Sequence, residues 1–200
     1  MTFCSTAVAA VLGFPLGMVL YCSSPAGLSP QPVLYKILSR IVSLLRFLPF
    51  IMLMILVIPL SRLIVGTSIG PAAVILPLSL AAAPFAARIS EEALQGLDGG
   101  VLLAARAAGS TNFQIIFKVL IPETLPSLIS GLTLTAVNLI GYSAAAGAIG
   151  GGGLGALAIN YGYYRFRTDV AVAAAIVILA LAALVRFAGT AASRALLSKR

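Results

Sequence analysis

The sequence predicts an all-α polytopic membrane protein with five transmembrane helices, in a single domain over residues 1–200. Of the 200 residues, 60% are hydrophobic and 9% charged, and the mean hydropathy is +1.11. A soluble domain carries about 25% charged residues, so an ordinary water-soluble enzyme is excluded. Long uncharged stretches alternate with short charged ones. Because about 20 apolar residues cross a bilayer, the chain has room for five spans.

The uncharged stretches place the spans in order. The first is expected at about 1–22, because no charge precedes Lys36 and Ser23-Ser24-Pro25 interrupts the apolar run. The second is expected at about 43–64, with Arg46 and Arg62 near its ends, where long basic side chains extend toward the headgroups. Charged residues and Pro and Gly clusters delimit the other three, at about 70–88, 124–149 and 169–190.

The first apolar segment has an alternative interpretation as a cleaved signal peptide or a lipoprotein signal ending at Cys22. No Lys or Arg precedes it, and a secretory signal normally begins with positive charge. Tyr21 is also large for the position before a lipoprotein cysteine. A transmembrane helix is therefore the favoured interpretation. Prolines 49, 59, 77 and 84 are expected to kink the second and third spans.

Positive charge predicts the orientation. The net charge is +8, and cytoplasmic loops of membrane proteins collect Lys and Arg. With the N-terminus outside and the C-terminus in the cytoplasm, three basic residues lie outside (Arg62, Arg165, Arg167). Ten lie on the cytoplasmic side: Lys36, Arg40, Arg46, Arg88, Arg106, Lys118, Arg186, Arg194, Lys199 and Arg200. We therefore attribute the positive charge to the orientation of the chain in the membrane and not to nucleic-acid binding.

One polar stretch, about 89–123, is predicted to form a cytoplasmic loop with two short helices. Asp98 is placed to cap the first helix, and Gly109 to end it in a left-handed conformation. Thr111 and Gln114 have the spacing of a capping box that starts the second helix. That helix is expected to end near Pro122, since proline cannot continue the hydrogen-bonded turn.

The same stretch resembles a family motif. Ala104-Ala105-x3-Gly109-x9-Val119-x-Ile121-Pro122 has the spacing of the cytoplasmic "EAA" loop of ABC-importer permeases, with Leu103 in place of the family's Glu. Several further segments occur in matching order, and together they resemble the permease subunits of D/L-methionine ABC importers. These segments are FLPF at 47–50, VGTSIG at 65–70, APF at 83–85, KVLIPE at 118–123, GYSA at 141–144, the glycine run at 150–155 and YGY at 161–163.

The resemblance implies a type I importer permease in the bacterial inner membrane. It implies two copies of this chain, a cytoplasmic ABC ATPase that binds the ATP, and a periplasmic methionine-binding lipoprotein. The family usually has more sequence ahead of the first span, so we expect the true N-terminus to lie upstream. Leu103 puts one docking contact in doubt. The residues expected to couple the permease to the ATPase are Ala104, Ala105, Arg106, Gly109, Lys118 and Pro122.

Asn138, Tyr142 and Ser143 are candidates for the translocation path. Polar groups in hydrocarbon need partners, so these side chains are expected to face the protein interior, and Asn138 and Tyr142 share one helical face. Either they form interhelical hydrogen bonds or they line the solute path. No carboxylate lies within a span except at its edges, which argues against an ion-coupled carrier.

The remaining chemistry is sparse. The chain has no His, two Cys and five Asp or Glu, so neither a metal centre nor histidine catalysis is expected. The glycine run 150–155 lacks the G-K-[ST] ending of a phosphate-binding loop, and no cofactor is expected in this chain. Two other functions remain open: an ABC permease for another small solute, and an ATPase-independent channel or secondary carrier.

Overall fold

A computed structural model describes residues 1–198, and this part of the chain is helical with no β-strand, which confirms the all-α prediction. The long helices are α1 (Thr2–Ser23), α4 (Pro71–Gln95), α7 (Ile121–Ala146) and α9 (Thr168–Leu197). Two helices of intermediate length are α2 (Pro32–Phe47) and α3 (Phe50–Val65). The short elements are α5 (Gly99–Ala107), α6 (Asn112–Ile115), η1 (Ile116–Leu120), η2 (Gly147–Ile149), α8 (Gly153–Leu157) and η3 (Ala158–Tyr163).

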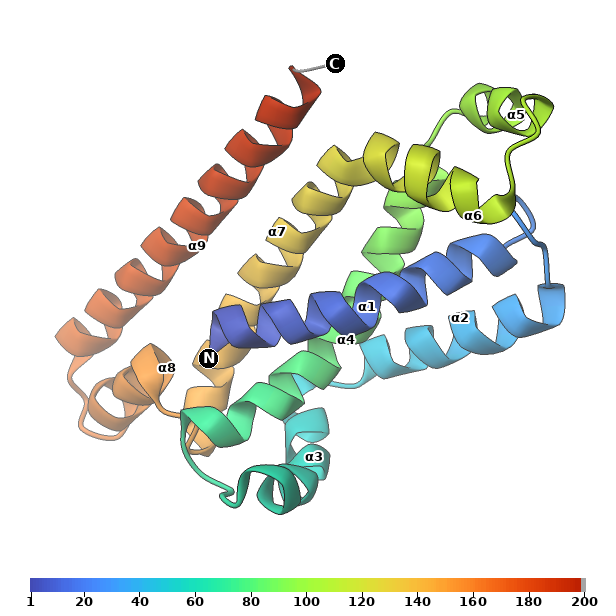
Figure 1. Cartoon of the computed structure of the whole chain (residues 1–200). Coiled ribbons are helices and arrows are strands. Elements are labelled where there is room, and N and C mark those ends of the chain that lie inside the picture. The colour runs from blue at the N-terminus through green and yellow to red at the C-terminus, as the bar shows by residue number, and fades with distance from the viewer. Residues whose placement is uncertain (199–200) are drawn as a thin grey trace.

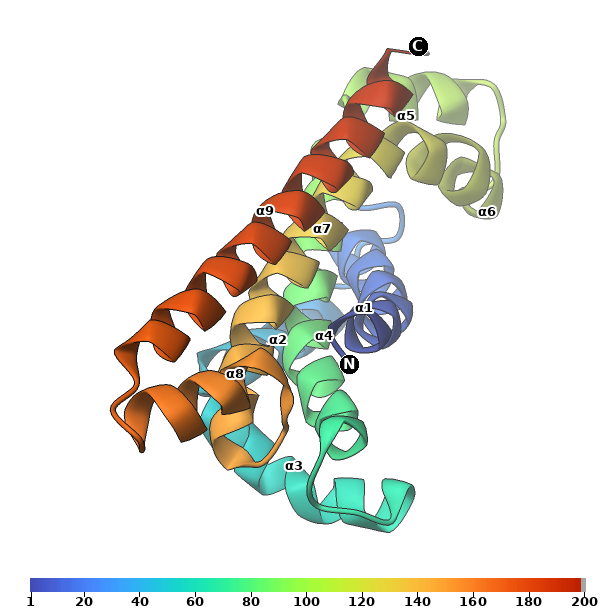
Figure 2. The same ribbon diagram turned by 90° about the vertical axis from the view of Figure 1, so that its left-hand side faces the viewer.

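Helices α4 and α7 form the centre of the bundle (Figure 1). Helix α1 packs along α4, and α9 runs beside α7 on the outer side, as Figures 1 and 2 both show. The short helices α5 and α6 lie together at one end of the bundle, and α8 lies at the other. The C-terminal end of α9 lies at the end of the bundle that carries α5 and α6.

The contact between α1 and α4 depends on two glycines. A Cβ atom added to Gly13 would lie 2.6 Å from Ala86 Cβ and 2.8 Å from the Ala83 carbonyl oxygen. One added to Gly17 would meet the Ala87 carbonyl oxygen. Small residues spaced four apart let two helix backbones approach closely. The Gly13-x3-Gly17 pattern therefore specifies this helix pair.

The second expected span, 43–64, is not one helix. The chain breaks at Leu48-Pro49, and α2 and α3 meet at an angle of 102°. Pro49 has no N–H to continue α2 and serves as the N-cap of α3. The described residues thus contain four helices long and apolar enough to cross a membrane, or five if α2 and α3 count as one broken span. Prolines 59, 77 and 84 lie inside helices.

The expectation that a helix ends near Pro122 is wrong. Residues 112–149 form one helical run of 38 residues that passes through this proline. The turn before Pro122 is the π-helical segment η1. A wider turn of this kind occurs inside α-helices as a bulge, and it gives the proline ring space that a regular turn lacks. The polar segment 89–123 therefore merges into transmembrane helices at both ends, since α4 also continues to Gln95.

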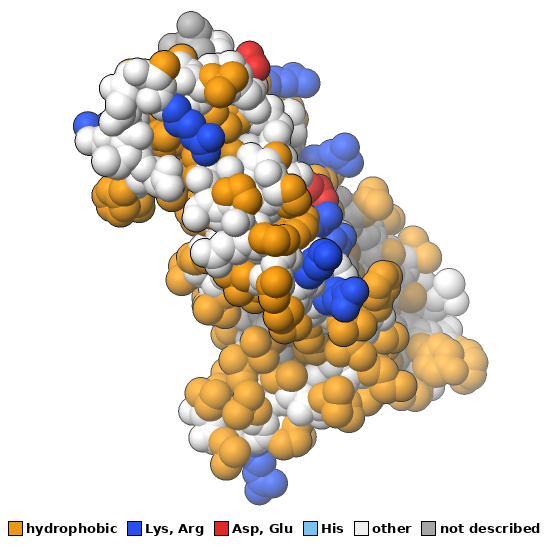
Figure 3. Space-filling model, turned by 90° about the vertical axis from the view of Figure 1, so that its right-hand side faces the viewer, with side chains coloured by type: hydrophobic (Ala, Val, Ile, Leu, Met, Phe, Trp, Pro, Cys, Tyr) orange, Lys and Arg blue, Asp and Glu red, His pale blue; other side chains and the backbone are white. Residues whose placement is uncertain are grey.

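The surface matches a membrane environment. On the face shown in Figure 3, hydrophobic side chains cover most of the lower part, and Lys and Arg side chains lie from the top down to about the middle, with one further basic group at the bottom. Helix α9 exposes large apolar residues along its whole length, among them Ile176, Leu179, Leu184 and Phe187. Lys199 and Arg200, which entered the orientation count, lie outside the described residues. Arg46 also lies at the α2–α3 break and not at a span end.

Candidate functional site: the α5–α6 segment and the polar face of α7

The α5–α6 segment has the local structure that the sequence predicts. Asp98 Oδ1 accepts a hydrogen bond from the Gly100 N–H at 2.9 Å, which caps α5. The Thr111 side chain accepts from the Gln114 N–H, and the Gln114 side chain accepts from the Thr111 N–H, so both halves of the capping box are present. Each bond satisfies a helix-terminal N–H that has no partner within the helix.

Gly109 forms the turn between the two helices. Its φ is +74°, in the left-handed region. The Gly109 N–H donates to the Arg106 carbonyl at 2.9 Å, and the Ser110 N–H donates to the Ala105 carbonyl at 3.1 Å. This pair of bonds is a Schellman motif, which uses glycine because an L side chain is strained at positive φ. The predicted helix–glycine turn–helix is therefore confirmed as structure.

The segment is anchored on its inner side. Ile115 and Leu120 are fully buried in a cluster with Tyr21 and Leu94, which joins α6 and η1 to α1 and α4. Arg106 Nη2 donates to the Leu28 carbonyl at 3.4 Å. Movement of α5 and α6 would therefore be transmitted to the long helices through packed side chains.

The outer side of the segment is exposed and partly apolar. Leu103 is 69% exposed and Phe113 is 70% exposed. The rings of Phe113 and Phe117 lie 4.5 Å apart between centroids. Ala104, Arg106, Gly109, Lys118 and Pro122 are exposed as well, whereas Ala105 is half-buried against the cluster. The exposed coupling residues thus extend from α5 and its glycine turn to Lys118 in η1 and Pro122 at the start of α7.

The three path candidates do not form one site. Tyr142 is exposed and stacks on Phe50, with ring centroids 4.8 Å apart and an interplanar angle of 4°. Asn138 is exposed on the same side of α7, and its side chain makes no hydrogen bond within residues 1–198. The expected orientation toward the interior is therefore wrong for Asn138 in the single chain, whereas Tyr142 packs against Phe50 of α3.

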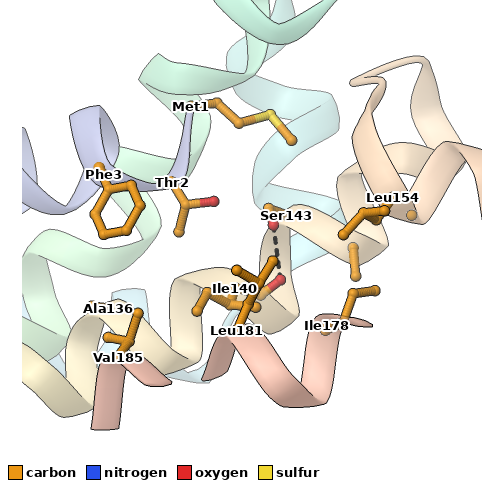
Figure 4. A pocket seen from close by; sticks show the side chains of 12 residues that line it. Met1, Thr2, Phe3, Ala136, Ile140, Ser143, Leu154, Ile178, Leu181 and Val185 are labelled. Carbon is orange, nitrogen blue, oxygen red and sulfur yellow. Dashed lines mark hydrogen bonds between the residues drawn. The ribbon is translucent and has the colours of Figure 1, made fainter. Parts of the chain in front are cut away.

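Ser143 lies elsewhere. Its hydroxyl donates to the Ile140 carbonyl at 2.8 Å, as Figure 4 shows. It faces a cavity of about 200 Å³ whose other walls are mainly apolar, formed by the start of α1, α7, α8 and α9. Its hydrogen-bonding capacity is used within its own helix, which is typical of a structural serine.

Comparison with known proteins agrees with this geometry. The family model "Binding-protein-dependent transport system inner membrane component" matches residues 13–198. The chain belongs to this family. It is 46% identical over 147 residues to the D-methionine transport system permease protein MetI of Escherichia coli K12, a match that covers 74% of this chain and 68% of MetI. The corresponding protein of Yersinia pestis is 48% identical over 147 residues, with the same coverage.

Solved structures of permeases in this family share the fold. A structure of inward-facing conformations of the MetNI methionine ABC transporter superposes with a TM-score of 0.95 at 43% identity, covering 98% of this chain and 91% of that chain. An amino acid ABC transporter gives a TM-score of 0.69 at 20% identity over 100% of this chain and 91% of that chain, which supports the fold alone.

Sequence reasoning missed two features of this permease. The exposed pair Phe113 and Phe117 lies on the outer face of the α5–α6 segment, and its four-residue spacing on a helix is a signal that was available. The stacked pair Phe50–Tyr142 joins α3 to α7. That contact has no signal in the sequence, because it depends on how two distant helices pack.

Proposed function

We propose that this chain is the membrane-spanning permease of an ATP-driven methionine importer. On this view two copies enclose the translocation path, and the α5–α6 segment docks on a separate cytoplasmic ATPase. The observation that carries the proposal is the protruding segment itself, which is exposed on its outer side and anchored to α1 and α4 on its inner side. A 0.95 TM-score to the MetNI transporter supports the same arrangement.

The residues of the segment have distinct proposed roles. Gly109 sets the angle between the two helices. The small side chain of Ala104 lets the ATPase approach the backbone of α5 closely. Arg106 and Lys118 are exposed cations that suit acidic groups on an ATPase. Leu103 replaces a carboxylate with an exposed apolar side chain, so we infer that docking at this point is hydrophobic and involves Phe113.

A homodimer is supported by the exposed amide of Asn138 on α7. A side-chain amide without a partner is costly in a hydrocarbon environment. Asn138 is exposed in the single chain and has no hydrogen bond within the described residues. A second copy, or a water-filled path between two copies, would supply the missing partner. Closed two-fold symmetry is the commonest arrangement of such assemblies.

We also propose that the N-terminus lies outside and the α5–α6 end in the cytoplasm. Without Arg46, Lys199 and Arg200, the count of basic residues is seven on the cytoplasmic side and three outside. The bias still follows the positive-inside rule. A periplasmic methionine-binding lipoprotein would then deliver its solute at the end that carries α8.

Reconstitution tests the proposal. The chain, its candidate ATPase and the binding protein are placed in liposomes, and uptake of labelled methionine is measured with and without ATP. Uptake that requires ATP and all three components is the expected result. ATP hydrolysis by the assembly without methionine uptake would support an ABC permease that carries a different solute. Uptake by the chain alone without ATP would favour a channel or secondary carrier.

A further inference from the structure

A small polar cavity lies at the α2–α3 break, and several of the residues that line it are exposed in the single chain. Its volume is about 220 Å³, and its lining includes Arg46, Phe50, Phe85 and Tyr142. Sites for drug-sized ligands measure about 300–1,000 Å³, so this cavity suits a solute the size of one amino acid. It brings together α2, α3, α4 and α7.

The depth of the cavity follows from its position on α4. Ala81 and Phe85 both line it, and α4 runs from Pro71 to Gln95. At a rise of 1.5 Å per residue, these two residues lie about 15 Å and about 21 Å from the first residue of a helix about 36 Å long. The end of α4 beyond Phe85 carries Arg88, Glu91 and Glu92, and the proposed orientation places Arg88 on the cytoplasmic side. The cavity therefore lies in the cytoplasmic half of the span, with Ala81 on its deeper side.

Arg46 is the unusual member of this lining. It lies in the last turn of α2 and is exposed to the cavity side of the break. Its guanidinium carbon lies 5.5 Å from the centroid of the Phe85 ring, which is a cation–π contact. No carboxylate within residues 1–198 pairs with it, since the ion pairs there involve Arg88 and Arg167. An arginine held against an aromatic ring in a cavity, without an acidic partner, is open to an anionic ligand.

The other walls complement the cation. The Phe50 and Tyr142 rings stack in parallel at 4.8 Å and present an aromatic surface, which attracts apolar and thioether groups. The last carbonyls of α2 have no donor within their helix, and Pro49 offers no N–H to them. They can accept hydrogen bonds from an ammonium group. One cavity thus offers a guanidinium and an aromatic wall beside the C-terminal end of α2.

We propose that this cavity is a solute-binding subsite within the permease itself, in which Arg46 holds the carboxylate of a small amino acid with an unbranched apolar side chain. The side chain lies against Phe50, Phe85 and Tyr142, and the carbonyls at the end of α2 receive the ammonium group. This subsite rests on the proposed function as an amino-acid importer, and it gives the permease a specificity of its own beside that of the binding protein.

Equilibrium binding to the purified assembly of permease and ATPase, without the binding protein, tests the subsite. The probes are labelled L-methionine and, as competitor, methioninol, which lacks the carboxylate. Methionine is expected to compete at least tenfold better than methioninol. Arg46→Gln is expected to weaken methionine binding about tenfold to a hundredfold, which is the loss that follows removal of a hydrogen bond to a charged group. It is also expected to abolish the preference for methionine over methioninol.

Arg62→Gln is the matched control, because Arg62 also lies in the last turn of a helix of the broken span, is exposed, and does not line the cavity. It should bind methionine as the wild type does. Binding that Arg46→Gln leaves unchanged would place the solute elsewhere in the assembly, including on the ATPase, and would overturn the subsite. So would equal competition by methionine and methioninol in the wild type.

Two further measurements keep the test decisive. Where Arg46→Gln does not assemble with the ATPase, Arg46→Lys takes its place, since it retains the charge but loses the paired N–H groups of the guanidinium. It is expected to weaken methionine binding, and unchanged binding would overturn the subsite. ATP-dependent uptake by the wild-type assembly with its binding protein separates the two proposals. Failure of that uptake rejects the methionine importer, whereas normal uptake without carboxylate discrimination rejects only the subsite.

Discussion

Replacing Gly109 by valine and, separately, by asparagine distinguishes two effects of a substitution in the α5–α6 turn: the strain of a positive φ and the bulk of the added side chain. Gly109 has a φ of +74°, and a Cβ atom there would have no atom of the chain within 4 Å. The penalty within the permease is therefore conformational. The left-handed region costs an L residue about 1–2 kcal/mol, and asparagine adopts it far more readily than a β-branched residue. Valine and asparagine have similar size.

The expected result is a loss of coupling in Gly109→Val that Gly109→Asn does not share. A cost of about 1–2 kcal/mol lowers the population of the correct turn about five- to thirtyfold. The assay is methionine imported per ATP hydrolysed in liposomes that hold the whole assembly, with complex formation checked by gel filtration. An equal loss of coupling in both variants would mean that side-chain bulk at the docked surface, and not the positive φ, determines coupling. Full coupling in Gly109→Val would refute the role of this turn.

Two predictions concern stability, measured by thermal unfolding in detergent. Glu91 is fully buried, and its Oε2 lies 2.7 Å from Arg88 Nη1. Glu91→Gln should cost about 1.5–3 kcal/mol, the loss of a hydrogen bond to a charged group, because Arg88 keeps Glu92 as a partner. Glu92→Gln, whose side chain is 63% exposed and 3.5 Å from the same arginine, should cost about 1 kcal/mol or less. Similar losses would contradict the difference in burial. Gly17→Ala should cost about 1–3 kcal/mol of stability by overpacking α1 against α4. Gly99→Ala is the control and should be near neutral, because a Cβ atom added there would have no atom within 4 Å. A Gly17→Ala variant as stable as the wild type would show that the two helices are not in close contact.

The parts of the fold that sequence predicts are those with local causes. The cap at Asp98, the capping box at Thr111 and the turn at Gly109 each involve residues two to five positions apart along the chain. Their geometry is set by helix-terminal hydrogen bonds and by the strain of a positive φ. Neighbouring helices have little influence on them. The all-helical membrane fold was predictable for a similar reason, because apolar length and charge spacing are properties of each segment alone.

Pro49 and Pro122 show where local sequence does not determine the structure. Pro49 separates two helices that meet at 102°, whereas Pro122 lies within a continuous helical run, after a π-helical turn. Both residues lack an N–H and crowd the preceding turn. The outcome at each depends on which neighbours cover the freed carbonyl groups. That information is in the tertiary packing, so a sequence pattern predicts a disturbance without its form.

The candidate path was predicted least well because its environment lies outside the single chain. Polar residues in a membrane span were expected to face inward, yet Asn138 and Tyr142 are exposed, and Arg46 has no acidic partner within residues 1–198. Tyr142 and Arg46 line one cavity. A lone chain in lipid would leave this amide and this cation unsatisfied, at a cost that folding alone does not offset. On the proposed function, the rule that polar groups face the interior would hold at the level of the assembly, where the interior is the path between two copies.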